Sequence, residues 1–215
     1  MFVSHRYRIV YYPMPKNASS SLKHVLFEID AGRPFDNQEG WPKSFIHSLY
    51  PAQPNGGFWT EAFKNYFSFF VIRDPIERFV SGFNNRVYRY GDVNPETKNN
   101  QGELLPTEPE INFFIDNLAF YLNYSKVLKS HFQLQLTFVN NVIDKVNKIY
   151  TVANLDGLYQ DLKNHTGLEK IQPRNRNRNK DNNSDIYSVN DINDKNKAVL
   201  KKIYHKDYVM FQKYL

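Results

Sequence analysis

The 215-residue sequence contains no cysteine, which excludes a disulfide framework, a thiol nucleophile and a thiolate metal site. Its six histidines are scattered without an H-E-x-x-H pattern or a close pair, so we expect no metal site. No apolar run approaches the roughly 20 residues of a membrane-spanning helix, and residues 1–10 lack the hydrophobic centre of a signal peptide. These absences predict a soluble, cytoplasmic protein without a membrane span.

The composition is that of a folded protein, with 41% hydrophobic and 16% aromatic residues. A length of 215 residues fits a single domain, which we expect to comprise residues 1–215. The net charge of +6 suits an anionic ligand, whether a nucleotide, an acidic glycan or a nucleic acid. Three arginines alternate with asparagines in a biased segment: Arg174, Arg176 and Arg178. They could close over a nucleotide or meet an acidic acceptor, but the composition favours a charged, solvated loop.

The first part of the chain has the pattern of a strand followed by a loop and a helix. Residues 7–12 (YRIVYY) predict a buried strand that stops at Pro13. After a polar, turn-forming segment, apolar side chains recur at the spacing of one helix face: Leu22, Val25, Leu26 and Ile29. Ser19 or Ser20 is available as the N-cap of that helix.

A second strand, loop and helix follow further along the chain. Residues 67–72 (FSFFVI) form the most apolar run, typical of a central strand covered on both faces. Asp74 is a suitable N-cap, Pro75 suits the first helical position, and Glu77 stands where it can complete a capping box.

The remaining pattern continues the alternation of strands and helices. We predict a helix over residues 110–128, a strand over 148–152, a helix over 155–163 and a long C-terminal helix over 194–214. Strands that alternate with helices favour a parallel sheet between helical layers. The predicted class is therefore α/β, a three-layer, P-loop-like fold with a central parallel sheet flanked by helices.

The loop between the first predicted strand and helix reads PKNASSSL, residues 15–22. A helix start offers unpaired backbone N–H groups and a partial positive charge, so phosphate binds there readily. Lys16 adds a full positive charge, and the serines add hydroxyl donors. The loop contains no glycine, so it is not a Walker A motif. The alternative is a serine-capped helix with a solvent-exposed lysine.

The second loop lies within VIRDPIERFVSGF, residues 71–83. Arg73 leaves the end of the predicted strand, and Ser81 lies about two turns into the following helix. An arginine can hold a phosphate through two hydrogen bonds, and a serine can supply another. The alternative is that Arg73 pairs with a surface acid and Ser81 only packs.

Taken together, the two segments resemble the sulfotransferase superfamily in their order, spacing and strand–helix context. Members of that superfamily use 3′-phosphoadenosine 5′-phosphosulfate (PAPS) as donor. PKNASSSL looks like the family's 5′-phosphosulfate loop, and VIRDPIERFVSGF is similar to its 3′-phosphate loop. The second segment is closest to the carbohydrate branch, which includes the uronyl 2-O-sulfotransferases and the HNK-1 and chondroitin enzymes.

The resemblance implies a role for each matching residue. Lys16 would contact the bridging oxygen between phosphate and sulfuryl, and Arg73 with Ser81 would hold the 3′-phosphate. The rest of the donor-binding loop would consist of Asn17, Ala18, Ser19, Ser20 and Ser21.

Two departures from the family pattern stand out. Many relatives have Thr, Ser or Gly where this chain has Asn17 and Ala18. Ala153 occupies the position of a family acid before Asn-Leu.

The resemblance also suggests a general base, which a poorly nucleophilic sugar hydroxyl requires. His47, in SFIHS, precedes the second motif much as a catalytic histidine does in the uronyl 2-O-sulfotransferases. His131 is the rival, as a base or as a substrate-binding residue, because the chondroitin-type branch has a histidine near that point. A purely structural role is the alternative for each.

The function implied is in-line transfer of a sulfuryl group from PAPS to a hydroxyl of a carbohydrate, with release of adenosine 3′,5′-bisphosphate. The positive net charge favours an acidic saccharide as acceptor. A kinase-like nucleotide-binding enzyme is one alternative, although the Walker A glycines are missing. Another is a non-catalytic module that binds glycan or nucleic acid. Against it, the tyrosines and phenylalanines fall at core periodicities rather than in a basic stacking pattern.

Overall fold

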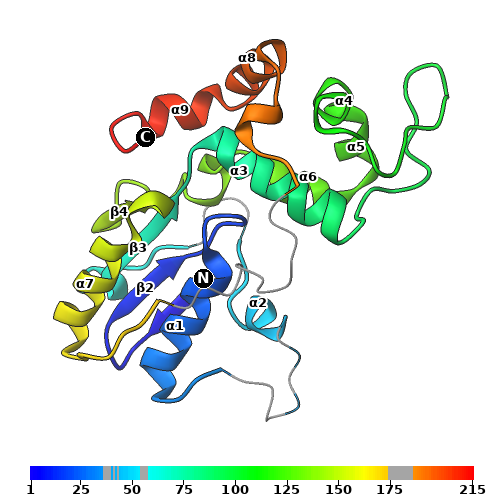
Figure 1. Cartoon of the computed structure of the whole chain (residues 1–215). Coiled ribbons are helices and arrows are strands. Elements are labelled where there is room, and N and C mark those ends of the chain that lie inside the picture. Colours follow the sequence, from blue (N-terminus) through cyan, green and yellow to red (C-terminus); the bar gives the residue numbers. More distant parts are fainter. Residues whose placement is uncertain (36–39, 41, 43, 54–57, 174–185) are drawn as a thin grey trace. The chain divides into compact units, whose positions relative to one another are not determined.

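A computed structural model of the chain describes residues 1–35, 40, 42, 44–53, 58–173 and 186–215 (Figure 1). The chain divides into two compact units. The first comprises Met1–Arg73, Gln135–Lys180 and Lys213–Leu215, and the second comprises Asp74–Leu134 and Asp181–Gln212. The alternating arginines of the biased segment, Arg174, Arg176 and Arg178, lie outside the described residues.

The first unit contains a four-stranded sheet with strand order β1-β2-β3-β4. Its strands are β1 (Phe2–Ser4), β2 (Ile9–Tyr12), β3 (Phe67–Ile72) and β4 (Lys148–Thr151). β2, β3 and β4 run parallel, whereas β1 pairs antiparallel with β2. The predicted α/β class with a sheet flanked by helices is confirmed. The sheet is mostly rather than wholly parallel, because the antiparallel β1 was not indicated by the sequence pattern.

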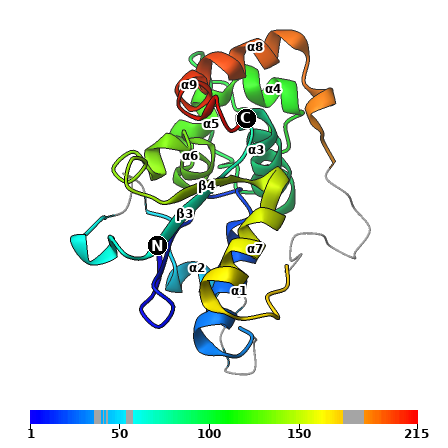
Figure 2. The same cartoon turned by 90° about the vertical axis from the view of Figure 1, so that its left-hand side faces the viewer.

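Helices cover one face of this sheet. The helices of the first unit are α1 (Ser19–Ala31), α2 (Phe45–Leu49), α7 (Leu155–Thr166) and short 3-10 turns at Glu61–Phe63, Leu136–Phe138 and Val152–Asn154. Leu26 of α1 and Leu158 of α7 share one buried cluster with Phe69 of β3, and both helices lie along the sheet in Figures 1 and 2. Burial of each such side chain contributes about 1.5–3 kcal/mol.

The strand register places the loops that follow β2, β3 and β4 at one edge of the sheet. Tyr12, at the end of β2, pairs with Phe70, and Ile72, at the end of β3, pairs with Thr151 at the end of β4. The three parallel strands therefore finish at the same edge. In open α/β sheets, ligands bind beyond this carboxyl edge.

The second unit is helical in its described residues. It contains α3 (Pro75–Gly82), a π-helical continuation (Phe83–Arg89), α4 (Ile111–Asp116), α5 (Leu118–Tyr124), α6 (Lys126–Phe132), a 3-10 turn (Val189–Asp191), α8 (Asp194–Ile203) and α9 (His205–Phe211). Its core is rich in aromatic rings, among them Phe79, Phe83 and Phe114. A Cβ at Gly82 of α3 would lie 3.1 Å from the ring of Phe132, so a larger residue there would require the ring to shift by a few tenths of an ångström.

The prediction of one continuous helix over residues 110–128 is wrong. The structure has α4, α5 and α6 in its place, with Asn117 (φ −112°, ψ 16°) and Ser125 (φ −131°, ψ 108°) outside helical geometry. The Ser125 side chain instead accepts a hydrogen bond from the Leu128 N–H and caps α6. A serine that caps a new helix cannot continue the previous one.

The predicted C-terminal helix is also interrupted. α8 and α9 meet at Tyr204, which has φ −95° and ψ 15°. The Tyr204 hydroxyl is buried and donates to the Phe132 carbonyl at 2.8 Å. This long-range hydrogen bond accompanies a break that the apolar spacing of the helix did not reveal.

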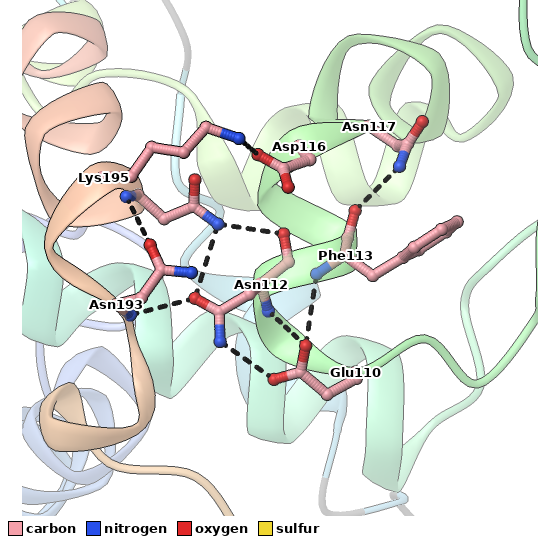
Figure 3. A network of polar contacts seen from close by, with 8 residues as sticks. Glu110, Asn112, Phe113, Asp116, Asn117, Asn193 and Lys195 are labelled. Carbon is pink, nitrogen blue, oxygen red and sulfur yellow. Dashed lines mark hydrogen bonds and ion pairs between the residues drawn. The ribbon is translucent and has the colours of Figure 1, made fainter.

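A polar network joins α4 to the start of α8 (Figure 3). The Asn112 amide donates to the Asp191 carbonyl at 2.9 Å, and its oxygen accepts from the Asn193 N–H at 3.0 Å. Lys195 and Asp116 form an ion pair at 3.0 Å beside them. The network therefore stabilises the packing of α4 against the start of α8 within the second unit.

Within the described part of the chain, no helix is both long enough and apolar enough to cross a membrane.

Candidate active site

The loop between β2 and α1 has an unusual backbone. Lys16 (φ 70°) and Ala18 (φ 57°) both adopt left-handed conformations, with Asn17 between them. For a residue other than glycine this conformation costs about 1–2 kcal/mol. Such strain persists only where the surroundings impose it, and it is frequent in loops that clamp a ligand.

The start of α1 differs from the prediction that Ser19 or Ser20 caps it. The N-cap is Ala18, and no side chain caps the helix. The left-handed turn at Ala18 starts the helix one residue early, so Ser19, Ser20 and Ser21 form its first turn. Among the described residues, no side chain caps its first N–H groups, which is the condition under which a helix start attracts an anion.

The start of α3 is different, because it is capped as predicted. The Asp74 carboxylate accepts hydrogen bonds from the N–H groups of Ile76 and Glu77 at 2.9 and 3.0 Å, and Pro75 occupies the first turn. A carboxylate already occupies this helix start, so an anionic ligand of the second loop depends on side chains such as Arg73.

Gln135 connects the two loops within the first unit. Its Oε1 accepts from the Arg73 N–H at 3.0 Å and from Asn17 Nδ2 at 2.6 Å, and its Nε2 donates to the Arg73 carbonyl at 2.8 Å. Asn17 Nδ2 also donates to the Val71 carbonyl at 2.8 Å. The backbone groups of Arg73 and Val71 fix the orientation of both amides. Gln135 therefore holds the Arg73 backbone and the middle of the first loop together.

Sequence reasoning missed Gln135. The only local signal is a polar side chain between Leu134 and Leu136, where a solvated position and a buried one look alike. The structure shows that Gln135 is fully buried, as is Asn17.

Replacing Gln135 by alanine is expected to lower the free energy of unfolding by about 2 kcal/mol, because buried partners at Arg73 and Asn17 lose their hydrogen bonds. Urea denaturation measures this change. Gln133→Ala is a matched control at a partly exposed glutamine two residues away, and we expect it to change stability much less. Equal effects of the two substitutions would contradict the bridging role.

His47 lies against the first turns of α1. Its Nε2 is 3.1 Å from Ser20 Oγ, and its Nδ1 is 3.2 Å from Lys23 Nζ. The structure thus brings one candidate base next to the candidate 5′-phosphate loop. Lys23 was not singled out from the sequence, yet it is only 2% exposed, and burial lowers its pKa to about 8.

Three further residues singled out from the sequence are Ser81, His131 and Ala153. Ser81, on α3, and His131, on α6, belong to the second unit. His131 Nδ1 donates to the Val127 carbonyl at 2.9 Å, which places the proton of the neutral ring on Nδ1. Ala153 is exposed in the turn before α7.

The sequence model of the sulfotransferase family matches residues 1–214. The chain belongs to the sulfotransferase family. The match includes both units, and it confirms the resemblance drawn from the two loops.

Several relatives are carbohydrate sulfotransferases. The chain is 30% identical to carbohydrate sulfotransferase 10 of Xenopus laevis over 96 residues, 40% of this chain and 25% of that protein. It is 23% identical to carbohydrate sulfotransferase 10 of Homo sapiens over 181 residues, 80% of this chain and 50% of that protein. The chain therefore spans a quarter to a half of the length of these relatives. No solved structure matches it significantly.

Proposed function

We propose that this sulfotransferase-family chain transfers a sulfuryl group from PAPS to a hydroxyl of a carbohydrate and releases adenosine 3′,5′-bisphosphate. Family membership and the named carbohydrate sulfotransferases support the proposal. The observation that carries it is the 3.1 Å contact between His47 Nε2 and Ser20 Oγ. The contact places an imidazole beside a helix start suited to a phosphate.

The 5′-phosphosulfate end of the donor fits the loop before α1. The hydroxyls of Ser19, Ser20 and Ser21 and the uncapped N–H groups of the first turn would bind the 5′-phosphate. Lys16 would neutralise the bridging oxygen. Asn17 is fully buried and bonded to Val71 and Gln135, so we propose that it and Ala18 shape the loop and contribute only backbone groups.

The 3′-phosphate is assigned to Arg73, with Ser81 as a second ligand. Gln135 fixes the Arg73 backbone through both its N–H and its carbonyl. The arginine side chain therefore leaves the carboxyl end of β3 from a defined point. A planar guanidinium can donate two hydrogen bonds to one phosphate, and this phosphate distinguishes PAPS from ordinary adenine nucleotides.

The proposed reaction is an in-line displacement at sulfur. A bond forms between the acceptor oxygen and sulfur while the bond between sulfur and the bridging oxygen breaks, and its electron pair goes to the departing phosphate. His47 accepts the proton of the acceptor hydroxyl. Lys16 and the N–H groups of α1 stabilise the charge that develops on the phosphate. Lysine and arginine supply the positive charge, so the proposal needs no divalent metal.

Calorimetric titration of the full chain with adenosine 3′,5′-bisphosphate, without divalent metal, tests the donor assignment. We expect tight binding of the bisphosphate and weaker binding of AMP, which lacks the 3′-phosphate. Preference for ATP with magnesium would support a kinase-like enzyme instead. Binding of single-stranded nucleic acid with a steep salt dependence would support a non-catalytic module.

The acceptor class is tested by sulfuryl transfer from PAPS to paired neutral and acidic oligosaccharides. The net charge of +6 favours the acidic member of each pair. Equal transfer to both members would remove the acidic preference from the proposal, and absence of transfer to any saccharide would count against a carbohydrate acceptor.

A further inference from the structure

Lys23 and Ser20 lie one helical turn apart on α1, so their side chains project from the same face. His47, on α2, contacts both of them, with Nδ1 on the lysine side and Nε2 on the serine side. The Lys23 side chain is almost entirely buried, whereas His47 is exposed. The imidazole therefore stands between a buried amino group and the proposed donor loop.

The charge of Lys23 influences which nitrogen of His47 carries the proton. An ammonium group has three donors and no acceptor, so charged Lys23 uses the lone pair of Nδ1. The neutral imidazole then carries its proton on Nε2 and donates it toward Ser20 Oγ. In this arrangement neither ring nitrogen has a lone pair for a new proton.

A neutral Lys23 permits the reverse arrangement. Its nitrogen then has a lone pair and can accept a hydrogen bond from Nδ1–H. The proton of the neutral imidazole lies on Nδ1, and Nε2 presents its lone pair on the Ser20 side. Only in this form of His47 is the unprotonated nitrogen, which can act as the base, on the side of the proposed 5′-phosphosulfate loop.

We propose that Lys23 is a positioning residue that sets the tautomer of His47, and that His47 acts as general base only when Lys23 is neutral. The second half rests on the proposed function; the first half does not. Lys23 is charged below its pKa, which burial lowers to about 8, and neutral above it. The base-competent tautomer should therefore increase as the pH rises through about 8.

Among the residues that the structure describes, burial is the cause of the lowered pKa of Lys23, and no carboxylate is found to oppose it. In the described structure His47 faces Lys23 from α2, and His24 follows it on α1. The Met1 amino group, which precedes β1, interacts with it electrostatically, and its own pKa is lowered to about 5 by burial first and by Lys23 second. These groups are neutral or cationic.

Nitrogen-15 NMR of the full chain with labelled histidine tests the tautomer directly, and His47→Gln assigns the signals. Near pH 7 we expect His47 mainly as the Nε2–H tautomer, with a transition to Nδ1–H through about pH 8. In Lys23→Met, which keeps the length of the side chain and removes its charge, this transition should be absent. A His47 signal that is the same from pH 7 to 9, or unchanged in Lys23→Met, would overturn the proposal.

The pH dependence of sulfuryl transfer tests the catalytic half. For the natural chain we expect kcat to rise through about pH 8. In Lys23→Met the rise near pH 8 should be lost, because the group that titrates there is gone. Lys201→Met, at an exposed lysine of α8, is the matched control and should leave the profile in place.

The NMR titration and the pH profile of sulfuryl transfer together distinguish failure of the inference from failure of the proposed function. A tautomer transition that depends on Lys23 in a chain without transferase activity would support the positioning role and refute the proposed function. An active chain whose pH profile does not respond to Lys23→Met would refute the catalytic half. Thermal unfolding of Lys23→Met tests whether this variant is folded.

Discussion

Lys16→Ala is expected to lower the turnover of sulfuryl transfer about a hundredfold. Lys16 begins the strained loop before α1, beside the helix start assigned to the 5′-phosphate. Its charge is needed most as negative charge develops on the departing phosphate. Loss of one such preorganised group typically raises the barrier by about 3 kcal/mol, which corresponds to a factor of roughly one hundred.

The fold should tolerate this substitution. Lys16 has a left-handed backbone (φ 70°), and alanine is disfavoured there to a similar degree, so the free energy of unfolding should change by less than about 0.5 kcal/mol. Single-turnover rates with PAPS, together with urea denaturation, separate the two effects. Lys64→Ala, at an exposed lysine of the same unit, is the control. Turnover close to that of the natural chain would exclude the proposed role of Lys16.

The local signals in the sequence predicted the start of α3 correctly. Asp74 and Pro75 act on the backbone within three residues of themselves, and their cap forms as expected. The apolar run of β3 needs only its own hydrophobicity to be identified as a buried strand, and its bounds match the prediction. Features that a short window determines are those that a single sequence reveals.

The missed features depend on residues far apart in the chain. Gln135 is 62 positions from Arg73 and 118 from Asn17, and no local pattern indicates that its amide is buried between them. Tyr204 interrupts the C-terminal helix while it donates to a carbonyl 72 residues away. Lys23 fits a helical surface by sequence, and only the structure shows that it is buried and contacts His47.

The N-cap of α1 was mispredicted for a different reason. A serine is a better cap than alanine in most helices, so propensity favoured Ser19 or Ser20. The loop instead holds Ala18 in a left-handed conformation and leaves the first turn uncapped. A site that binds an anion benefits from this exception, because a serine cap would compete with the phosphate for the same N–H groups. The presence of Ala18 instead of a serine at the N-cap is thus consistent with the proposed function.

Arg73→Ala is expected to weaken binding of adenosine 3′,5′-bisphosphate about a hundredfold, equivalent to roughly 3 kcal/mol at 25 °C. The guanidinium is assigned to the 3′-phosphate, which AMP lacks. The affinity for AMP should therefore stay within about a factor of three. Removal of the side chain leaves intact the two hydrogen bonds between the Gln135 side chain and the Arg73 backbone, so we expect the loop to keep its conformation.

Paired titrations of the natural chain, Arg73→Ala and the control Arg6→Ala measure this difference. Arg6 is exposed in the same unit, with its guanidinium 5.2 Å from the centre of the Tyr7 ring, and its removal tests the effect of losing one positive charge anywhere. A loss confined to the bisphosphate and to Arg73→Ala assigns the guanidinium to the 3′-phosphate. Equal losses for bisphosphate and AMP would place Arg73 elsewhere on the nucleotide, and unchanged affinity for both would exclude it from the donor site.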